Sequence, residues 1–295
     1  MLDIGFSSWK RFAFNGTHIA CQRYTKLSKP ILPEEKMREV DLNSDLGESF
    51  GPYRIGDDEA MLGLITSANV ACGFHGGDPV VMHRTATRAL EGSVDLGAHP
   101  GFNDLWGFGR RKIIGDSPAD IEKMLIYQIA ALQGMARAVG HRVTHVKLHG
   151  ALATLAFEDR GLSDALVRAM RALDRDLVLV STPHNETERA ARRGGVRVAC
   201  EVFADRLYAD NGLLLPRSEP GAVIHDPAAA AAQALRMVDE QAIRTVGGRK
   251  VAMPVHTICV HGDNPHGVAI ATAVRAALEG AGVRLRPISE LNIET

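Results

Sequence analysis

Short apolar segments that end in a polar side chain recur along this chain, and helix-like stretches separate most of them. Seven such segments end in histidine, a carboxylate or lysine, usually beside glycine: 41–45, 71–76, 97–100, 145–150, 181–184, 201–206 and 259–263. Parallel strands joined by helices all end on the same side of a sheet. In a β/α barrel the catalytic site is built on that face. The pattern therefore predicts an enzyme whose polar residues converge at the carboxyl ends of its strands.

The alternation of strands and helices begins near residue 38. Strands are predicted over 40–44, 68–71, 94–98, 143–148, 177–180, 196–203, 257–260 and 283–285, and helices over 57–65, 79–91, 118–139, 228–237 and 266–278. Asp78-Pro79 and Ser117-Pro118 each place an N-cap acceptor before a proline, which is typical of helix starts. Seven or eight such units fit a single-domain α/β fold, a closed β/α barrel over residues 37–295. An open doubly wound sheet would carry a glycine-rich phosphate fingerprint after its first strand, where this chain has acids at 45–51.

Composition argues against several classes of partner. Lysine plus arginine, 34 residues, nearly balances aspartate plus glutamate, 35 residues, so no basic stripe favours nucleic acid. No apolar stretch approaches the roughly 20 residues that span a membrane. The four cysteines lack paired metal-ligand spacing, and a reducing, cytoplasmic setting is expected. A small-molecule substrate is the remaining expectation, and a homo-oligomer stays open.

Residues 1–36 differ from the rest of the chain. They show no strand–helix alternation, and five basic residues give them a mildly transit-peptide-like composition without the apolar region of a secretory signal. Met37 stands directly before the first convincing strand. We expect this N-terminal extension to be either a product of a misassigned start or a peripheral segment.

The block from residue 41 to residue 111 carries the densest group of candidate site residues. Asn43, Asp45 and Glu48 end or follow the first strand, His75 follows the second and His99 follows the third. One carboxylate and two histidines from neighbouring strands, here Asp45, His75 and His99, can bind a divalent metal and leave positions for water. The same residues can equally form a metal-free acid/base site in which a carboxylate orients a histidine.

Lys147 and His149 form a second signal. They lie two residues apart in a strand, so they point the same way, into the barrel or towards its mouth. A buried lysine is costly unless it is paired, and its pKa falls readily, which favours a role in the site. Glu201, inside a strand-like run, is the natural counter-ion of Lys147, and that pair can also be purely structural.

Other polar residues at strand ends and in a glycine-rich loop are predicted to bind substrate. In the loop at 107–111, the two arginines can clamp a carboxylate or a phosphate. The chain has no Walker-type phosphate loop and no nucleophile elbow, so a nucleotide would bind elsewhere or with a partner. The predicted substrate-binding residues are Asn43, Glu48, Arg110, Arg111, Glu201, Asp205, Arg206, His261 and Asp263.

Several ordered motifs closely resemble those of the LamB/YcsF family, over about residues 38–288. They lie at 41–48, 66–79, 97–102, 107–111, 145–151, 201–206 and 257–263. The resemblance implies a barrel of the glycoside hydrolase/deacetylase type. It also implies ATP-dependent opening of 5-oxoproline (pyroglutamate) to glutamate by one subunit of a 5-oxoprolinase, with partner subunits B and C. ATP is then the expected cofactor, bound with those partners, and a divalent metal is the second candidate.

The resemblance and the chemistry together suggest roles for five catalytic candidates. Asp45, His75 and His99 would act on water or a metal, while Lys147 and His149 would transfer a proton or stabilise an oxyanion. Ser44 replaces a cysteine that is usual in the family, which argues against a thiol nucleophile. Leu148 replaces a usual proline, and Ala153-Thr154 replaces a usual Tyr-Asn pair. These last changes lie near His149 and bear on the exact fit of the substrate. The alternatives are a metal-dependent deacetylase or carbohydrate-active hydrolase that acts alone, and a non-catalytic regulatory subunit.

Overall fold

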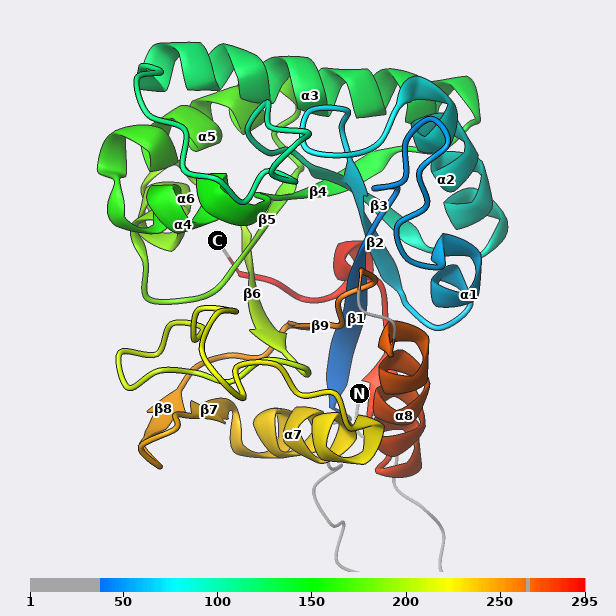
Figure 1. Cartoon of the computed structure of the whole chain (residues 1–295), viewed down its shortest axis with the longest axis vertical. Coiled ribbons are helices and arrows are strands. Elements are labelled where there is room, and N and C mark those ends of the chain that lie inside the picture. The colour runs from blue at the N-terminus through cyan, green and yellow to red at the C-terminus, as the bar shows by residue number, and fades with distance from the viewer. Residues whose placement is uncertain (1–37, 264–265, 295) are drawn as a thin grey trace, which may run out of the picture. The chain divides into compact units, whose positions relative to one another are not determined.

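Seven parallel strands close into a barrel in the described part of the chain, residues 38–263 and 266–294 of a computed structural model. β1 pairs with both β2 and β9, which closes the ring (Figure 1). The predicted β/α barrel is confirmed, with seven strands in the ring. Their order is β1 (Glu39–Leu46), β2 (Ser67–Ala71), β3 (Asp95–His99), β4 (Val143–Lys147), β5 (Val178–Ser181), β6 (Val198–Phe203) and β9 (Thr257–Cys259).

The last predicted strand is present but is not an eighth member of the ring. β10 (Arg284–Leu285) pairs only with the first residues of β1. The short 3₁₀ helix η1 (Ile288–Glu290) follows, and its Ile288 packs with Val178 and Val180 of β5. The Ile288 amide also donates to Ser67 Oγ at the start of β2, at 3.2 Å. The C-terminal segment therefore covers the amino-terminal end of the barrel, opposite the strand ends that were predicted to form the site.

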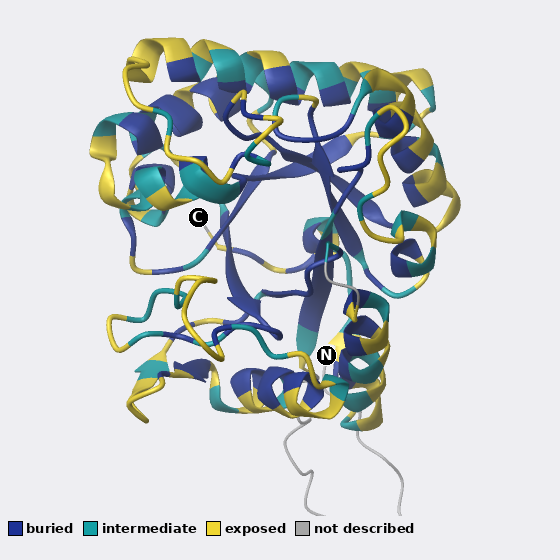
Figure 2. Cartoon of the chain, in the orientation of Figure 1, coloured by how far each residue is buried: buried dark blue, intermediate teal, exposed yellow. Residues whose placement is uncertain are grey.

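Helices and one hairpin surround the strands. Figure 2 shows the strands almost wholly buried and the helices exposed on their outer sides. The helices are α1 (Asp58–Leu62), α2 (Pro79–Glu91), α3 (Pro118–Ala138), α4 (Gly150–Glu158), α5 (Arg160–Leu173), α6 (Glu186–Arg193), α7 (Pro227–Glu240) and α8 (Gly267–Gly280); β7 (Ala242–Arg244) and β8 (Lys250–Ala252) form the antiparallel hairpin. Asp78 and Ser117 cap α2 and α3 as predicted, whereas α4, α5 and α6 were not predicted. Among the described residues, no helix combines the length and apolar character that crossing a bilayer requires.

The two faces of each barrel strand carry different kinds of side chain. Residues that point outward, such as Leu42, Val146 and Ile258, are fully buried in the apolar layer beneath the helices. Residues that alternate with them point into the barrel, because side chains alternate across a strand. The inward set is largely polar: Asp41, Asn43, Asp45, Ser67, Asn69, His99, His145, Lys147, Glu201, Thr257 and Cys259. The barrel interior is thus a hydrogen-bonded column that leads up to the strand ends.

Asp41 at the base of this column leads to a stability prediction. The hydroxyls of Thr66 and Ser67 donate to its Oδ1 at 2.7 and 2.6 Å, yet burial raises the pKa of Asp41 from 3.8 to about 7. Between these values the unfolded chain releases a proton that the folded chain keeps, so the free energy of unfolding falls as pH rises from about 4 to about 7. Asp41→Asn removes this loss. The free energy of unfolding of the variant minus that of the parent, measured by urea denaturation, should be about 1 to 4 kcal/mol larger at pH 8 than at pH 5. A difference that is the same at both pH values would contradict the titration of Asp41.

Candidate active site

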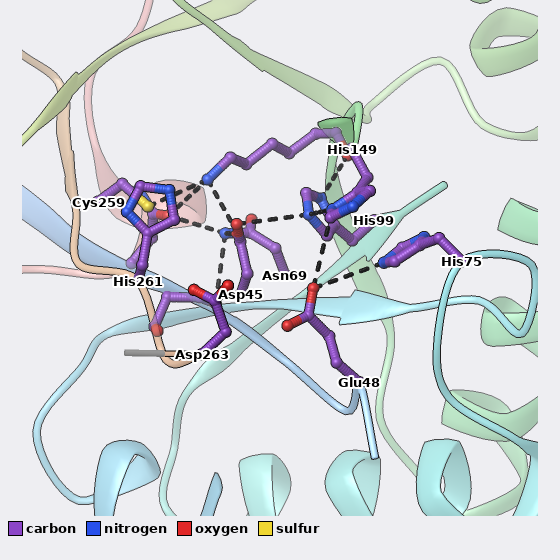
Figure 3. A network of polar contacts seen from close by, with 12 residues as sticks. Asp45, Glu48, Asn69, His75, His99, His149, Cys259, His261 and Asp263 are labelled. Atoms are coloured by element: carbon purple, nitrogen blue, oxygen red, sulfur yellow. Dashed lines mark hydrogen bonds and ion pairs between the residues drawn. The ribbon is translucent and has the colours of Figure 1, made fainter. Parts of the chain in front are cut away.

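A pocket of about 600 Å³ opens at the carboxyl ends of the strands. Its floor contains Asp45 from β1, His99 from β3, Lys147 from β4 and Glu201 from β6. Figure 3 shows Asp45 and His99 in a group of polar side chains that converge from different strands and loops. Further lining residues come from the loops after the strands and, for Glu158, from the end of α4: Arg110, Lys112, His149, Glu158, Arg206, Arg217 and His261.

Lys147 is held between two carboxylates at the floor of the pocket. Its Nζ lies 2.9 Å from Asp45 Oδ1 and 2.8 Å from Glu201 Oε1, so the predicted pairing with Glu201 is confirmed. Nζ also donates to Cys259 Sγ at 3.2 Å. Burial by itself would lower the pKa of Lys147, but Asp45 and the other acidic groups outweigh burial and raise it well above its ordinary value. Lys147 is therefore a fixed cation and is not suited to act as a base at neutral pH.

Asp45 remains ionised in spite of its burial. Burial alone would raise its pKa, but His99 and Lys147 together hold the pKa of Asp45 well below its ordinary value. Asn69 Nδ2 donates to Asp45 Oδ1 at 2.9 Å and to Asn43 Oδ1 at 2.8 Å. Asn43 thus lies one level below the pocket, where it positions Asn69 instead of lining the cavity.

His99 and His149 are each anchored by a backbone carbonyl. His99 Nδ1 lies 2.8 Å from the oxygen of Lys147, and His149 Nε2 lies 2.7 Å from the oxygen of Phe108. Because a carbonyl only accepts, both ring nitrogens must carry a proton. The other two nitrogens, His99 Nε2 and His149 Nδ1, face each other at 2.9 Å. With both rings neutral, two lone pairs meet there, an arrangement that a cation or a shared proton would stabilise. Burial, and then His99, lower the pKa of His149 to about 3, which disfavours the extra proton on that ring.

His75 and Glu48 complete this cluster. The His75 ring is fully buried and stacks on His149 at 3.7 Å between centroids, but neither of its nitrogens has a hydrogen-bond partner among the described residues. Its Nε2 lies 3.5 Å from Glu48 Oε1. Burial, followed by the negative charges of Asp45 and Asp263, raises the pKa of Glu48 well above its ordinary value. Buried polar groups normally have a hydrogen-bond partner, so the two unsatisfied nitrogens of His75 beside a carboxyl group indicate that a ligand binds here.

The cluster fits a divalent metal. Glu48, His75, His99 and His149 each offer a ligand atom, and these atoms lie within 4.8 Å of one another. Three imidazoles and one carboxylate suit a transition metal better than Mg²⁺ or Ca²⁺. The carbonyl anchors on His99 and His149 are also the kind of outer contact that orients metal-binding histidines. Of the predicted trio, His75 and His99 are members, while Asp45 stands next to them with Oδ2 3.4 Å from His99 Nε2.

A second group, Asp45, Cys259 and His261, also has ligand atoms within 4.8 Å of one another. Here the Lys147 ammonium already contacts both Asp45 and Cys259. Burial raises the pKa of the Cys259 thiol well above its ordinary value, which disfavours the thiolate that a metal needs. This group therefore forms the polar surroundings of the Lys147 ammonium and is not a good metal site.

Glycines in the loops make room for the histidines. A Cβ at Gly109 would lie 2.7 Å from both His149 Cδ2 and His75 Cβ, and the φ of Gly109 is +63°. The neighbouring Phe108 also has a positive φ, 54°, which is uncommon for a residue with a side chain. This strained turn directs the Phe108 carbonyl at His149, and the Phe108 ring lies edge-on to it at 5.2 Å. The Gly-Phe-Gly motif therefore shapes the histidine cluster.

His261 and Asp205 form a separate pair on the opposite wall. His261 Nδ1 lies 2.9 Å from both carboxylate oxygens of Asp205, and its ring stacks on Phe203 at 5.4 Å. The carboxylate fixes the Nδ1–H tautomer, which leaves Nε2 as the second proton site of the ring. A histidine oriented in this way can transfer a proton to or from a ligand in the pocket.

The arginines predicted to bind substrate occupy different places. Arg110 lines the pocket and its Nη2 lies 2.6 Å from Asp263 Oδ2. Arg111 instead pairs with Asp104 within its own loop, where Nε donates at 2.9 Å, and it does not line the pocket. Arg206 lines the pocket, and its guanidinium donates to backbone carbonyls.

Some residues of the site were not identified from the sequence, among them Asn69, Phe108, Arg217 and Cys259. Asn69 was detectable, because an asparagine at an inward position of a short buried strand requires polar partners. Cys259 has no paired metal-ligand spacing that would mark it in the sequence, and the structure reveals its contact with Lys147. Arg217 lies in a loop with no periodic pattern, so only the fold reveals that it reaches the pocket.

Known proteins are similar to this chain in sequence and in fold. The sequence profile of the LamB/YcsF family matches residues 40–293. A protein of Gluconobacter oxydans (strain 621H), named as the A subunit of 5-oxoprolinase, is 50% identical over 252 residues, which cover 85% of this chain and 99% of that protein. A protein of the same name from Symbiobacterium thermophilum is 50% identical over 247 residues, or 84% of this chain and 94% of that protein.

A solved structure agrees with the sequence comparison. The crystal structure of a lactam utilization protein from Thermus thermophilus superposes with a TM-score of 0.80 and 45% identity, over 84% of this chain and 99% of that one. The fold, the sequence profile and the relatives therefore agree, and the chain belongs to the LamB/YcsF family.

Proposed function

We propose that this chain is the lactam-handling subunit of an ATP-dependent 5-oxoprolinase, which opens 5-oxo-L-proline to L-glutamate. The observation that carries the proposal is the Lys147 ammonium at the pocket floor, fixed between Asp45 and Glu201 beside the histidine cluster. A preorganised cation stabilises the negative charge that develops on a carbonyl oxygen when water attacks. The choice of substrate is supported by the relatives that bear the name of the 5-oxoprolinase A subunit.

The surrounding residues supply the other parts of a ring-opening reaction. Glu48, His75, His99 and His149 are proposed to hold a divalent metal, which would lower the pKa of a bound water. Asp45 would orient the attacking water next to Lys147. The leaving ring nitrogen needs a proton, and His261, positioned by Asp205, is the proposed donor. Arg110 is the proposed partner of the substrate carboxylate.

ATP and two partner subunits complete the proposal. A lactam is a poor electrophile, and transfer of the γ-phosphoryl group of ATP to its carbonyl oxygen releases ADP and activates the ring. Water then adds to the ring carbon, the carbon–nitrogen bond breaks and the nitrogen takes up a proton, which leaves an acyl phosphate. A second water converts the acyl phosphate into glutamate and inorganic phosphate. Since the sequence has no Walker-type loop, we assign nucleotide binding to subunits B and C.

Reconstitution tests this proposal directly. Glutamate formation from 5-oxoproline and ATP should be absent or nearly so with this chain alone, and should appear when subunits B and C are added. Conversion by the chain alone would reject the division of labour. Hydrolysis of an acetylated sugar by the chain alone would favour the metal-dependent hydrolase instead. Full activity of subunits B and C without this chain would favour a regulatory role.

The first 36 residues are proposed to be dispensable. They lie outside the described residues, the family profile begins at residue 40, and the Gluconobacter protein is matched over 99% of its length. A chain that starts at Met37 should keep its thermal midpoint within experimental error in a melting curve. Insoluble protein, or a midpoint lower by many degrees, would show that the extension stabilises the barrel.

The reducing, cytoplasmic setting is likewise a proposal, in keeping with three unpaired buried cysteines, Cys72, Cys200 and Cys259.

A further inference from the structure

Arg206 is a buried cation, and the acidic group whose charge acts on it, Asp205, is hydrogen-bonded to His261 instead. Arg206 is 6% exposed, and no carboxylate of residues 38–263 or 266–294 forms an ion pair with it. Its Nε donates to the Ala222 carbonyl at 3.4 Å, and its Nη2 donates to the Leu215 carbonyl. The neighbouring Asp205 uses both oxygens on His261. Burying an unpaired charge is costly, so a side chain kept in this state is suited to an anion that arrives from the pocket.

Arg217 stands beside Arg206 on the same wall of the pocket. Burial lowers the pKa of Arg206 and the positive charge of Arg217 lowers it further, while the negative charge of Asp205 raises it. The acidic contact of Arg217 is a long one, with Nη2 3.9 Å from Asp263 Oδ1. The same carboxylate is already engaged by Arg110 at 2.6 Å. Arg206 and Arg217 therefore both line the cavity, while the carboxylates near them are paired with other residues. The two guanidinium groups can still bind an anion.

The remaining charges of the pocket do not cancel this excess. At the floor, Lys147 is paired with both Asp45 and Glu201, so this trio keeps one net negative charge and adds no positive charge to the pocket. The lining further contains one more cation, Lys112, and one exposed carboxylate, Glu158. The positive charge is thus concentrated at the wall formed by the loop after β6, apart from the floor.

The cavity is large enough for a ligand that carries a second anionic group besides the lactam carboxylate. About 600 Å³ lies within the range of sites for ligands much larger than a small lactam ring. With the ring at Lys147 and its carboxylate at Arg110, the wall of Arg206 and Arg217 stays available. Guanidinium groups match the geometry of phosphate oxygens, to which they donate in pairs.

We propose that Arg206 and Arg217 form a phosphoryl subsite, so that this subunit receives its lactam already phosphorylated on the carbonyl oxygen. The inference rests on the proposed function, because it specifies the chemical form in which the substrate reaches the same site. The reaction that supplies the substrate is then a phosphoryl transfer from ATP carried out elsewhere in the assembly. The phosphoryl group stays at the arginines while the ring opens.

Binding of inorganic phosphate to the purified full chain tests the subsite without any turnover. Calorimetric titration at fixed ionic strength should show saturable binding. Arg217→Ala, at a partly exposed position, should weaken it at least about tenfold, since a charge-assisted hydrogen bond is lost. Arg206→Lys should weaken it as well, with an unchanged thermal midpoint as evidence of folding. Asp263→Asn should strengthen it, because Arg217 loses its competing carboxylate. Arg236→Ala, at an exposed position of α7, is the matched control and should have no effect.

The same variants separate a phosphoryl site from a carboxylate site. Titration with 5-oxoproline should respond to Arg110→Ala and hardly to Arg217→Ala. If the parent chain does not bind phosphate, or binds it as well as Arg217→Ala and Arg206→Lys do, the subsite does not exist. If Arg217→Ala weakens 5-oxoproline and leaves phosphate unchanged, the arginines bind the lactam carboxylate and the inference is wrong. Failure of the proposed function would be seen elsewhere, as absence of glutamate formation by the complete assembly.

Discussion

Replacing Lys147 by methionine should reduce glutamate formation by the reconstituted complex by about 100- to 10,000-fold. Methionine fills the space of the lysine stem but lacks the ammonium that contacts Asp45 at 2.9 Å and Glu201 at 2.8 Å. Since the pKa of Lys147 is raised, it is the positive charge that the variant removes, not a base. The measurement is the rate of glutamate release at saturating 5-oxoproline and ATP.

The variant leaves two buried carboxylates without their cation, so stability has to be separated from catalysis. Removing one partner of a buried pair costs about 3 to 5 kcal/mol. The double variant Lys147→Met/Glu201→Gln removes one charge of each sign and should recover much of that loss, yet remain inactive. Glu201→Gln alone keeps Lys147 next to Asp45 and should retain far more activity. If the double variant is folded and turns over within a few-fold of the parent, Lys147 is only a structural counter-ion.

Substitution of His75 or His99 by alanine should abolish metal binding. The chain purified without chelators should carry about one divalent transition-metal ion, because four ligand atoms lie within 4.8 Å of one another. Each substitution removes one imidazole, and the affinity should fall at least about 100-fold, since outer-contact changes alone cost about 10- to 100-fold. The measurement is metal content by elemental analysis, followed by titration of the stripped protein with Co²⁺.

The chain offers a matched control for this experiment. His83 lies on the exposed face of α2, away from the inward histidines, so His83→Ala should keep the full metal content. Glu48→Gln should reduce the affinity, while Asp45→Asn should leave most of it if Asp45 serves water instead of the metal. Equal metal content in the parent and His75→Ala would mean that the cluster is a metal-free acid/base site.

The ends of the strands could be predicted because they follow from local chemistry. An apolar run that stops at a polar residue next to glycine places that residue at a strand end, and the alternation of side chains fixes which residues point inward. Lys147 and Glu201 were paired correctly for this reason: both occupy inward positions on barrel strands. The helices α2 and α3 were located by their caps. By contrast, α4 is apolar on nearly every side and carries little periodic signal.

The composition of the histidine cluster could not be predicted in the same way. Glu48 and His149 lie just beyond strand ends, where the chain direction depends on turns that no periodicity encodes. The strained backbone at Phe108 is one example, because its carbonyl fixes the tautomer of His149. Arg206 and Arg217 are a second example, since their shared wall arises from a long irregular segment between β6 and α7.

The barrel, the face that carries the site and the family could all be read from the order of the residues, because strand periodicity, helix caps and ordered motifs are properties of neighbours in the chain. Which of the candidates touch one another depended on the folded molecule. Folding brought Glu48 to His75 at 3.5 Å, placed Lys147 against Cys259 at 3.2 Å and left Arg206 buried without an ion pair among the described residues. These contacts join residues that loops and ring closure bring together, and their charges set each other's pKa values only at those distances.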